Sequence, residues 1–357
     1  MKFNKFKFKI YIIFIILFIK GLLIKFKVKK KRIGVIGLAH SQNVGNNLLK
    51  YAMFIKLSEL GYNPIIVGKR FLEHNISFIT NNVNIRLIKK FSDINESDFD
   101  ILMVNSDQTW TLYNDDFLNV AFLKFAENWN KPKFTYAVSL GSDKWIYSKE
   151  DENIAKNLLK NFTGLSVREK TTAALIEIHL GFRAQLVLDP TFLINKNYYL
   201  NLIKNFKSEI IAPLNKDNYI FSYILTETNQ TENFLSYVSK ELNIKIFYLN
   251  ILQPNQVEEF LSGIIHCKAV ITDSYHGTLF SIIFKKPFIT LINFNSVYSD
   301  PNRFKSIGEL LNIENRIFNI NSFPPISLLK EPLVFNEEKL ISLKRESINY
   351  LITNLRH

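Results

Sequence analysis

The chain has 357 residues, of which 47% are hydrophobic and 22% charged, so it is long enough for two domains with substantial cores and is not a disordered protein. Its net charge of +13 comes almost entirely from residues 1–32, which carry ten lysines, one arginine and no acid. The rest of the chain is close to neutral, which argues against a nucleic-acid partner, since such proteins carry a basic face on the folded body.

The N-terminal extension, residues 1–31, places ten apolar residues, 10–19, between lysines. This run is shorter than the roughly 20 residues of a membrane-spanning helix, and the first alanine, Ala39, comes too late for a secretory cleavage site. Three interpretations remain open: an anchor that lies on an anionic membrane through residues 1–32, a short signal-anchor in which Lys20 reaches the interface, and a disordered or wrongly assigned start. Cationic flanks around a short apolar run favour the first, a peripheral membrane contact.

The first half of the remaining chain alternates strand and helix patterns. A buried strand is expected at 33–38, then a polar loop, an amphipathic helix at 47–60 and a strand at 64–67. This βαβ order predicts a parallel sheet. Further strands are expected at 101–104, 134–138, 164–167 and 185–188, and helices near 151–161 and 170–180.

The second half repeats the alternation after a more polar stretch that reads as a linker. Strands are expected at 219–224, 245–248, 269–272 and 288–292, and helices at 232–242, 256–265, 277–284 and 337–354. The sequence therefore predicts an N-terminal Rossmann-like domain at 32–195, a linker at 196–218, a C-terminal Rossmann-like domain at 219–330 and an amphipathic C-terminal helix within 331–357.

The segment 269–280 carries the most informative pattern. A run of β-formers ends at a polar turn with Asp273, Ser274 and His276, and Gly277 then opens an apolar helix. Ligands of parallel sheets bind beyond the carboxyl ends of the strands, and helix N-termini favour anions. These residues therefore stand where a site is expected.

Seven segments, in chain order, resemble motifs of the polysaccharide pyruvyl transferase family. The likeness covers about residues 33–316, and Asn105 departs from the family's pattern, which has glycine at that position. The segments are 43–52 (NVGNNLLKYA), 105–110 (NSDQTW), 136–141 (YAVSLG), 166–169 (SVRE), 187–191 (VLDPT), 269–280 and 302–304 (NRF).

This resemblance implies an α/β fold with two doubly wound domains in a GT-B-like arrangement and a cleft between them. It implies transfer of a pyruvyl group from phosphoenolpyruvate to two hydroxyls of a sugar, giving a ketal. The acceptor would be a cell-surface polysaccharide or its lipid-linked precursor, in the cytoplasm at the inner face of the membrane. No cofactor or metal beyond the donor substrate is expected, and the single cysteine, Cys267, is compatible with a reducing compartment.

In the C-terminal half, His276 is predicted to bind the donor or deliver a proton, with a core or capping histidine as the alternative. Asp273 either orients its imidazole or caps the helix, Ser274 is a further binding residue, and Gly277 is expected to let the backbone approach a ligand. Arg303 is predicted to reach the same anion.

Arg168 ends an apolar strand and is predicted to hold a phosphate or carboxylate with its guanidinium fork. The alternative is an ion pair with Glu169 or a neighbouring acid. Arg316 is interpreted as structural.

In the N-terminal half, Asn43, Gly45 and Asn46 are expected in a polar loop that binds sugar hydroxyls or a second anion.

Beyond the strand at 101–104 come the binding candidates Ser106 and Gln108, and Asp107 as base for an acceptor hydroxyl or simply a turn residue. Trp110 would stack on a sugar or be buried.

Two other functions remain open on sequence alone. One is a nucleotide-sugar-dependent glycosyltransferase with the same fold, and the other is a non-catalytic glycan-binding or assembly protein.

Overall fold

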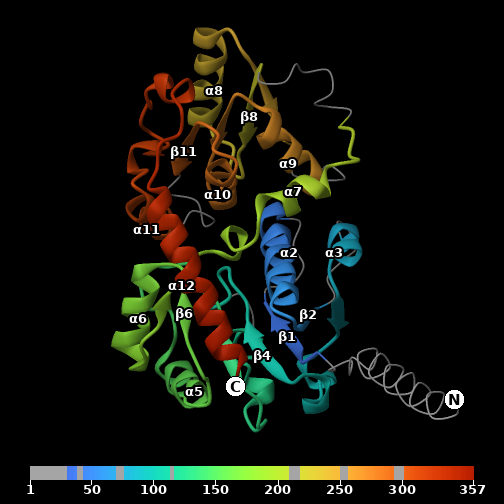
Figure 1. Ribbon diagram of the computed structural model, residues 1–357. Coiled ribbons are helices and arrows are strands. Elements are labelled where there is room, and N and C mark those ends of the chain that lie inside the picture. Colours follow the sequence, from blue (N-terminus) through green and yellow to red (C-terminus); the bar gives the residue numbers. More distant parts are fainter. Residues whose placement is uncertain are drawn as a thin grey trace, which may run out of the picture.

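The described chain folds into two five-stranded parallel β-sheets, one from each half of the sequence, and a two-stranded sheet beside the first, with helices packed around them (Figure 1). The computed structural model describes residues 30–37, 43–69, 76–112, 116–208, 218–249, 256–292 and 301–357. Almost all of the predicted N-terminal extension, and residues 209–217 of the predicted linker, lie outside these ranges. The predicted α/β class with two Rossmann-like units is confirmed.

The N-terminal sheet has the order β3-β2-β1-β4-β5, and isolated bridges connect β5 to the two-stranded sheet β6-β7. All pairings are parallel, and the order reverses between β1 and β4, which is the position where ligands of such sheets bind. The strands are β1 (Arg32–Ile36), β2 (Asn63–Lys69), β3 (Ile85–Ile88), β4 (Ile101–Val104), β5 (Lys133–Thr135), β6 (Ser166–Val167) and β7 (Gln185–Leu186).

Helices follow most of these strands, as the βα alternation requires. β5 is shorter than predicted because Ala137 takes a left-handed backbone with φ 52°, which ends the strand. The helices of this half are α2 (Val44–Glu59), α3 (Ile76–Asn82), α4 (Phe117–Phe122), α5 (Lys149–Leu159), α6 (Lys170–Leu180) and α7 (Lys196–Leu202), and a 3₁₀ turn, η4, spans Pro190–Phe192.

The C-terminal sheet has the order β12-β11-β10-β8-β9, again all parallel. The strand order reverses between β10 and β8, which are neighbours, so the loops that follow these two strands lie next to each other. The elements are β8 (Tyr219–Tyr223), α8 (Asn229–Leu242), β9 (Lys245–Tyr248), α9 (Gln256–His266), β10 (Ala269–Thr272), α10 (Tyr275–Ile283), β11 (Phe288–Ile292), α11 (Pro301–Leu311), β12 (Ile317–Asn319) and α12 (Glu337–Leu355).

Several helices begin earlier than the sequence predicted, and two of these shifts, at α2 and α10, affect the site. α2 starts at Val44, because the side chain of Asn43 accepts a hydrogen bond from the amide of Asn46 and caps the helix. α10 starts at Tyr275, with Ser274 as its cap. Gly45, Asn46 and His276 therefore lie in first helical turns rather than in loops.

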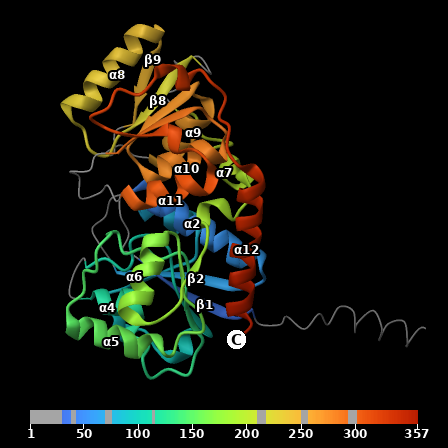
Figure 2. The same ribbon diagram turned by 90° about the vertical axis from the view of Figure 1, so that its left-hand side faces the viewer.

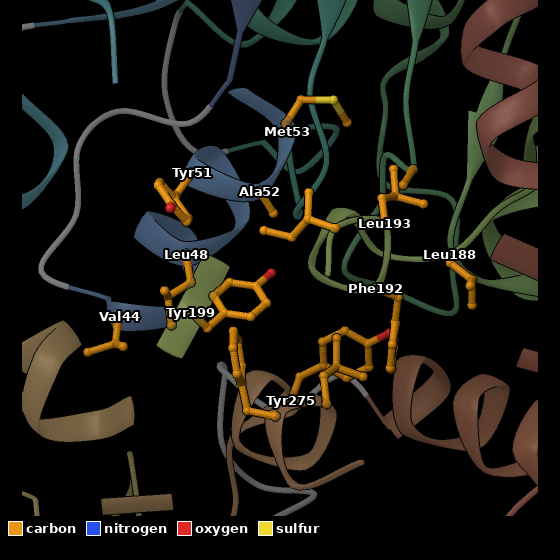
Figure 3. Packing of buried hydrophobic residues seen from close by; sticks show 14 of the residues in the cluster. Val44, Leu48, Tyr51, Ala52, Met53, Leu188, Phe192, Leu193, Tyr199 and Tyr275 are labelled. Atoms are coloured by element: carbon orange, nitrogen blue, oxygen red, sulfur yellow. The ribbon is translucent and has the colours of Figure 1, made fainter. Parts of the chain in front are cut away.

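An apolar cluster joins the two halves of the chain. Figure 3 shows Val44 and Leu48 of α2, Tyr199 of α7 and Tyr275 of α10 packed around one region. Leu48 and Tyr199 are fully buried, so this junction excludes water and fixes the N-terminus of α2 against α10.

The C-terminal helix α12 packs back against the N-terminal sheet, as both ribbon views show (Figures 1 and 2). Tyr350 donates a hydrogen bond to the carbonyl of Thr135, and the amide of Leu188 donates to Ser347. The last helix is thus part of the packing of the first domain, which the sequence pattern did not reveal.

Of the described residues, no helix is both long and apolar enough to cross a membrane.

Leu351 provides a test of the α12 packing. It is fully buried, so Leu351→Ala should lower the free energy of unfolding by about 2–5 kcal/mol through lost burial and a residual cavity. Ile341, on the same helix, is 59% exposed, and Ile341→Ala should change stability little. Urea unfolding of both variants measures the difference, and equal shifts would contradict this packing.

Candidate functional site

Arg168 lies at the centre of a buried charge cluster at the end of β6. Its side chain is only 1% exposed. Nε donates to Glu169 Oε1 at 2.9 Å, Nη1 to Asp189 Oδ2 at 3.2 Å and Nη2 to Asp107 Oδ1 at 3.1 Å. The guanidinium is therefore engaged by three carboxylates within the protein. This is the ion-pair alternative predicted from the sequence, and direct binding of a substrate anion by Arg168 does not fit the geometry.

Asp107 follows β4 and has a left-handed backbone with φ 95°, a conformation that costs of order 1–3 kcal/mol outside glycine. Its Oδ1 accepts from Arg168, and its Oδ2 accepts from Asn46 Nδ2 at 2.9 Å. Burial alone would raise the pKa of this carboxyl, but the charge of Arg168, with smaller contributions from His276 and Arg303, holds it well below its usual range. Such a carboxylate is a weak base, so the predicted role of Asp107 as the base for an acceptor hydroxyl is not supported.

His276 stands in the first turn of α10 and is 5% exposed. Its Nε2 lies 3.8 Å from Asp189 Oδ2 and has no hydrogen-bond partner among the described residues. Burial lowers the pKa of the imidazole below its ordinary value, although the negative charges of Asp189 and Asp107 oppose this shift. The ring is therefore neutral at neutral pH and able to accept a proton.

Gly45 brings the two halves of the site together. A Cβ atom at this position would stand 2.1 Å from Nδ1 of His276, so only glycine lets the first turn of α2 approach the imidazole this closely. The N-termini of α2 and α10, one from each domain, consequently meet at His276. Two helix N-termini at one point favour an anion there.

Asn46 contributes a second unsatisfied polar atom to this region. It is 3% exposed, and while its amide nitrogen donates to Asp107, its Oδ1 has no partner within the part of the chain that the structure describes. A buried carbonyl oxygen without a donor is costly, so it marks a place where a ligand hydroxyl or water would bind.

Asp273 serves a different purpose from either predicted role. Its two carboxylate oxygens accept hydrogen bonds from the backbone amides of Leu225 at 2.6 Å and Thr226 at 2.9 Å, in the loop after β8. It therefore ties the loops after β8 and β10 together, and it neither orients His276 nor caps α10. Burial raises the pKa of this carboxyl to about 6.

Ser274 and Gly277 have structural roles. The hydroxyl of Ser274 accepts from the amide of Gly277 as the helix cap. A Cβ atom at Gly277 would stand 2.3 Å from Thr272 Oγ1, so the close approach that requires glycine is to strand β10 and not to a ligand as predicted.

Arg303 joins the cluster from the first turn of α11 and is 8% exposed. Both guanidinium groups lie near the ring of Tyr275, with Arg168 Cζ 5.0 Å and Arg303 Cζ 5.3 Å from the ring centroid. The charge of Arg303 acts on Asp107, and the expected binding of the donor anion by Arg303 stays a prediction.

Apart from Asp107, the predicted site residues that follow β4 contact other parts of the fold. Ser106 donates to the carbonyl of Ala137 at 2.9 Å, and Trp110 is fully buried against Phe122 at 4.7 Å between ring centroids. Gln108 lies beside Gly141, where an added Cβ would stand 2.9 Å from its amide. These side chains are outside the cluster around Arg168, and the Trp110 geometry matches the buried alternative.

Asn105, where the family pattern has glycine, has a backbone conformation that does not need glycine. It is not among the residues with positive φ, so glycine is not required at this position, and the left-handed turn falls on Asp107 instead. The buried Oδ1 of Asn105 has no partner in the described ranges.

The sequence analysis missed two members of the cluster, Lys50 and Asp189, and named Glu169 only as an ion-pair partner of Arg168. Lys50 is 2% exposed, and burial lowers its pKa to about 8, against an opposing effect of Asp107. It stands four residues after Asn46 on the same helix face, and a lysine inside an otherwise apolar helical stretch was the available signal. Glu169 and Asp189 are acids at or just beyond strand ends, where ligand sites form.

No group of three or more His, Cys, Asp and Glu side chains in the described part of the chain is arranged to hold a metal ion.

Comparison with solved structures identifies the fold as GT-B. MnaA of S. aureus, solved with UDP, is 14% identical over 89% of this chain and 88% of its own, with a TM-score of 0.51. Anabaena HepE, in complex with UDP and glucose, is 11% identical over 90% of this chain and 94% of its own, with a TM-score of 0.51. Arabidopsis thaliana UGT89C1, complexed with UDP-L-rhamnose, is 9% identical over 91% and 99%, with a TM-score of 0.53.

No curated protein matches the sequence. The family model of polysaccharide pyruvyl transferases matches residues 43–296, which is well over half of the chain and contains Asn46, Asp107, Arg168 and His276. The chain belongs to the polysaccharide pyruvyl transferase family.

Proposed function

We propose that this protein transfers the pyruvyl group of phosphoenolpyruvate to two hydroxyls of a sugar, forming a cyclic ketal on a cell-surface polysaccharide or its lipid-linked precursor. The observation that carries the proposal is the neutral, unbonded imidazole of His276, held where the N-termini of α2 and α10 meet and next to ionised carboxylates. Family membership supports the reaction class.

The reaction needs one group that first accepts and then donates a proton. As the first sugar oxygen bonds to C2 of the donor, its proton passes to His276, and His276 hands this proton on to C3, which becomes a methyl group. The second sugar oxygen then bonds to C2, the bond from C2 to the phosphate oxygen breaks, and phosphate leaves with the remaining proton. Asp189, 3.8 Å from Nε2, would stabilise the transient imidazolium.

The anionic donor would bind at the two helix N-termini, whose amides and partial positive charge suit a phosphate or carboxylate. Arg303, which also faces this cluster, would add a permanent charge. Asn46 Oδ1 needs a donor and therefore suits a sugar hydroxyl rather than a phosphate oxygen. The proposal needs no metal and no cofactor besides phosphoenolpyruvate.

The proposed acceptor is inferred from the sequence. A glycan or lipid-linked glycan at the inner face of the cytoplasmic membrane would fit the basic and apolar character of residues 1–32.

Purified full-length protein should release phosphate from phosphoenolpyruvate only when a glycan acceptor is added. His276→Ala should lower this rate by about 10²- to 10⁴-fold, as expected for loss of an acid–base group. His357→Ala, at the exposed C-terminal residue, is the matched control and should keep full activity. Phosphate release is followed by a coupled assay, and the ketal by mass spectrometry of the glycan.

The competing functions give different results in the same experiment. A nucleotide-sugar-dependent glycosyltransferase would bind UDP in calorimetry and ignore phosphoenolpyruvate. A non-catalytic glycan-binding protein would bind glycan equally well with and without His276. Either result would contradict the proposal.

Gly45→Ala tests the contact between the two domains at the imidazole. The added methyl must displace the ring of His276, and a misplacement of about 1 Å is expected to reduce kcat roughly a hundredfold. In the control, Gly37→Ala, the new Cβ would lie 3.6 Å from Asn105 Cβ, an ordinary contact. Steady-state kinetics together with thermal unfolding separate misplacement from misfolding, and normal turnover in Gly45→Ala would refute the role of this contact.

A further inference from the structure

The buried cluster around Arg168 has more negative than positive permanent charge. Three carboxylates, Asp107, Glu169 and Asp189, pair with the guanidinium of Arg168, and the charge of Arg303 acts on Asp107. Because His276 is neutral at neutral pH, one negative charge is left in excess. An anionic donor carrying a phosphate and a carboxylate would be repelled unless another cation stood beside the cluster.

Lys50 is placed to be that cation. It lies one helical turn beyond Asn46 on α2, and Asn46 is hydrogen-bonded to Asp107 at 2.9 Å. The lysine is 2% exposed, and Asp107 is the charged group that acts on it. A lysine is seldom buried this completely unless its charge is used, because moving an ammonium group out of water is costly.

The elements packed against α2 carry few other charges that could take this role. Asp189 precedes η4, His276 lies in α10, and Glu258 and Glu259 lie in α9, where Glu259 accepts a hydrogen bond from Ser208. All of these except His276 are acids. Asp273 is a further acid, on whose pKa the charge of Arg303 acts.

We propose that Lys50 is the charge-compensating residue of the donor site, which keeps its proton when phosphoenolpyruvate binds and so allows this carboxylate-rich cluster to accept an anion. This inference rests on the proposed function and adds to it a residue that acts on binding rather than on proton transfer to the substrate.

The sign of the pH effect follows from the charge. In the free protein the pKa of Lys50 is lowered to about 8 by burial, so the amine is largely neutral at pH 9. A bound anion raises the pKa, so the complex holds the proton more tightly. Binding therefore takes up a proton above pH 8, and affinity should fall by up to about tenfold for each pH unit above that value.

Calorimetric titration of full-length protein with phosphoenolpyruvate, from pH 7.5 to 9.5, measures this effect. In this range the phosphate group of the ligand stays in one ionisation state, because its second pKa is near 6. Titrations in two buffers of different ionisation enthalpy count the protons taken up by the wild-type protein, which requires no variant at all.

Two substitutions separate charge from structure. Lys50→Arg keeps a permanent charge and should bind without the loss of affinity above pH 8. Lys50→Met keeps the apolar stem and should bind about tenfold or more weakly at pH 7.5, with no pH dependence up to pH 9.5. Lys56→Met, on the same helix, loses only the contact of Lys56 with Glu59 and should bind as the wild type does.

The outcomes are distinct. If Lys50→Met or Lys50→Arg keeps the pH dependence of the wild type, or if the wild type takes up no proton, the role of Lys50 is refuted while the proposed function stands. If the wild type does not bind phosphoenolpyruvate at any pH, both proposals are refuted. Thermal unfolding of each variant confirms that it is folded before it is titrated.

Discussion

The ion pairs of Arg168 are the interaction on which the site depends. A buried guanidinium is stable only when nearby acids and hydrogen bonds offset its lost hydration, and here Asp107, Glu169 and Asp189 do so. These acids come from the loop after β4, the end of β6 and the start of η4. One side chain thus holds together three segments at the same edge of the N-terminal sheet, and it determines where their carboxylates point.

Burial and the charges of the cluster together shift the pKa values of Asp107, His276 and Lys50. The positive charge of Arg168 keeps Asp107 ionised, while burial keeps His276 neutral and makes Lys50 easy to deprotonate. A neutral imidazole beside carboxylates can take a proton from a sugar hydroxyl and pass it to C3 of the donor, as the proposed reaction requires. The site is therefore suited to moving a proton rather than to holding a permanent positive charge at the histidine.

The sequence predicted the succession of strands and helices along the chain well, because βα alternation and apolar runs are local signals. It placed Arg168 and Asp107 just beyond strand ends, where the structure has them, but it placed His276 in the turn before α10 rather than in the first turn of that helix. It could not predict which acids Arg168 would bind, since Asp189 lies 21 residues away and Asp107 61, and such pairings depend on the folded sheet. It also placed the start of α2 too late, because the cap at Asn43 is a side-chain contact rather than a periodic pattern.

The same connections that position the cluster also limit how the two domains can move. α11, which carries Arg303, packs against α12, and α12 is bonded through Tyr350 to the strand segment at Thr135, next to the strand that leads to Arg168. A motion that opened the domains at α12 would break these contacts together with the buried apolar junction of α2 and α10.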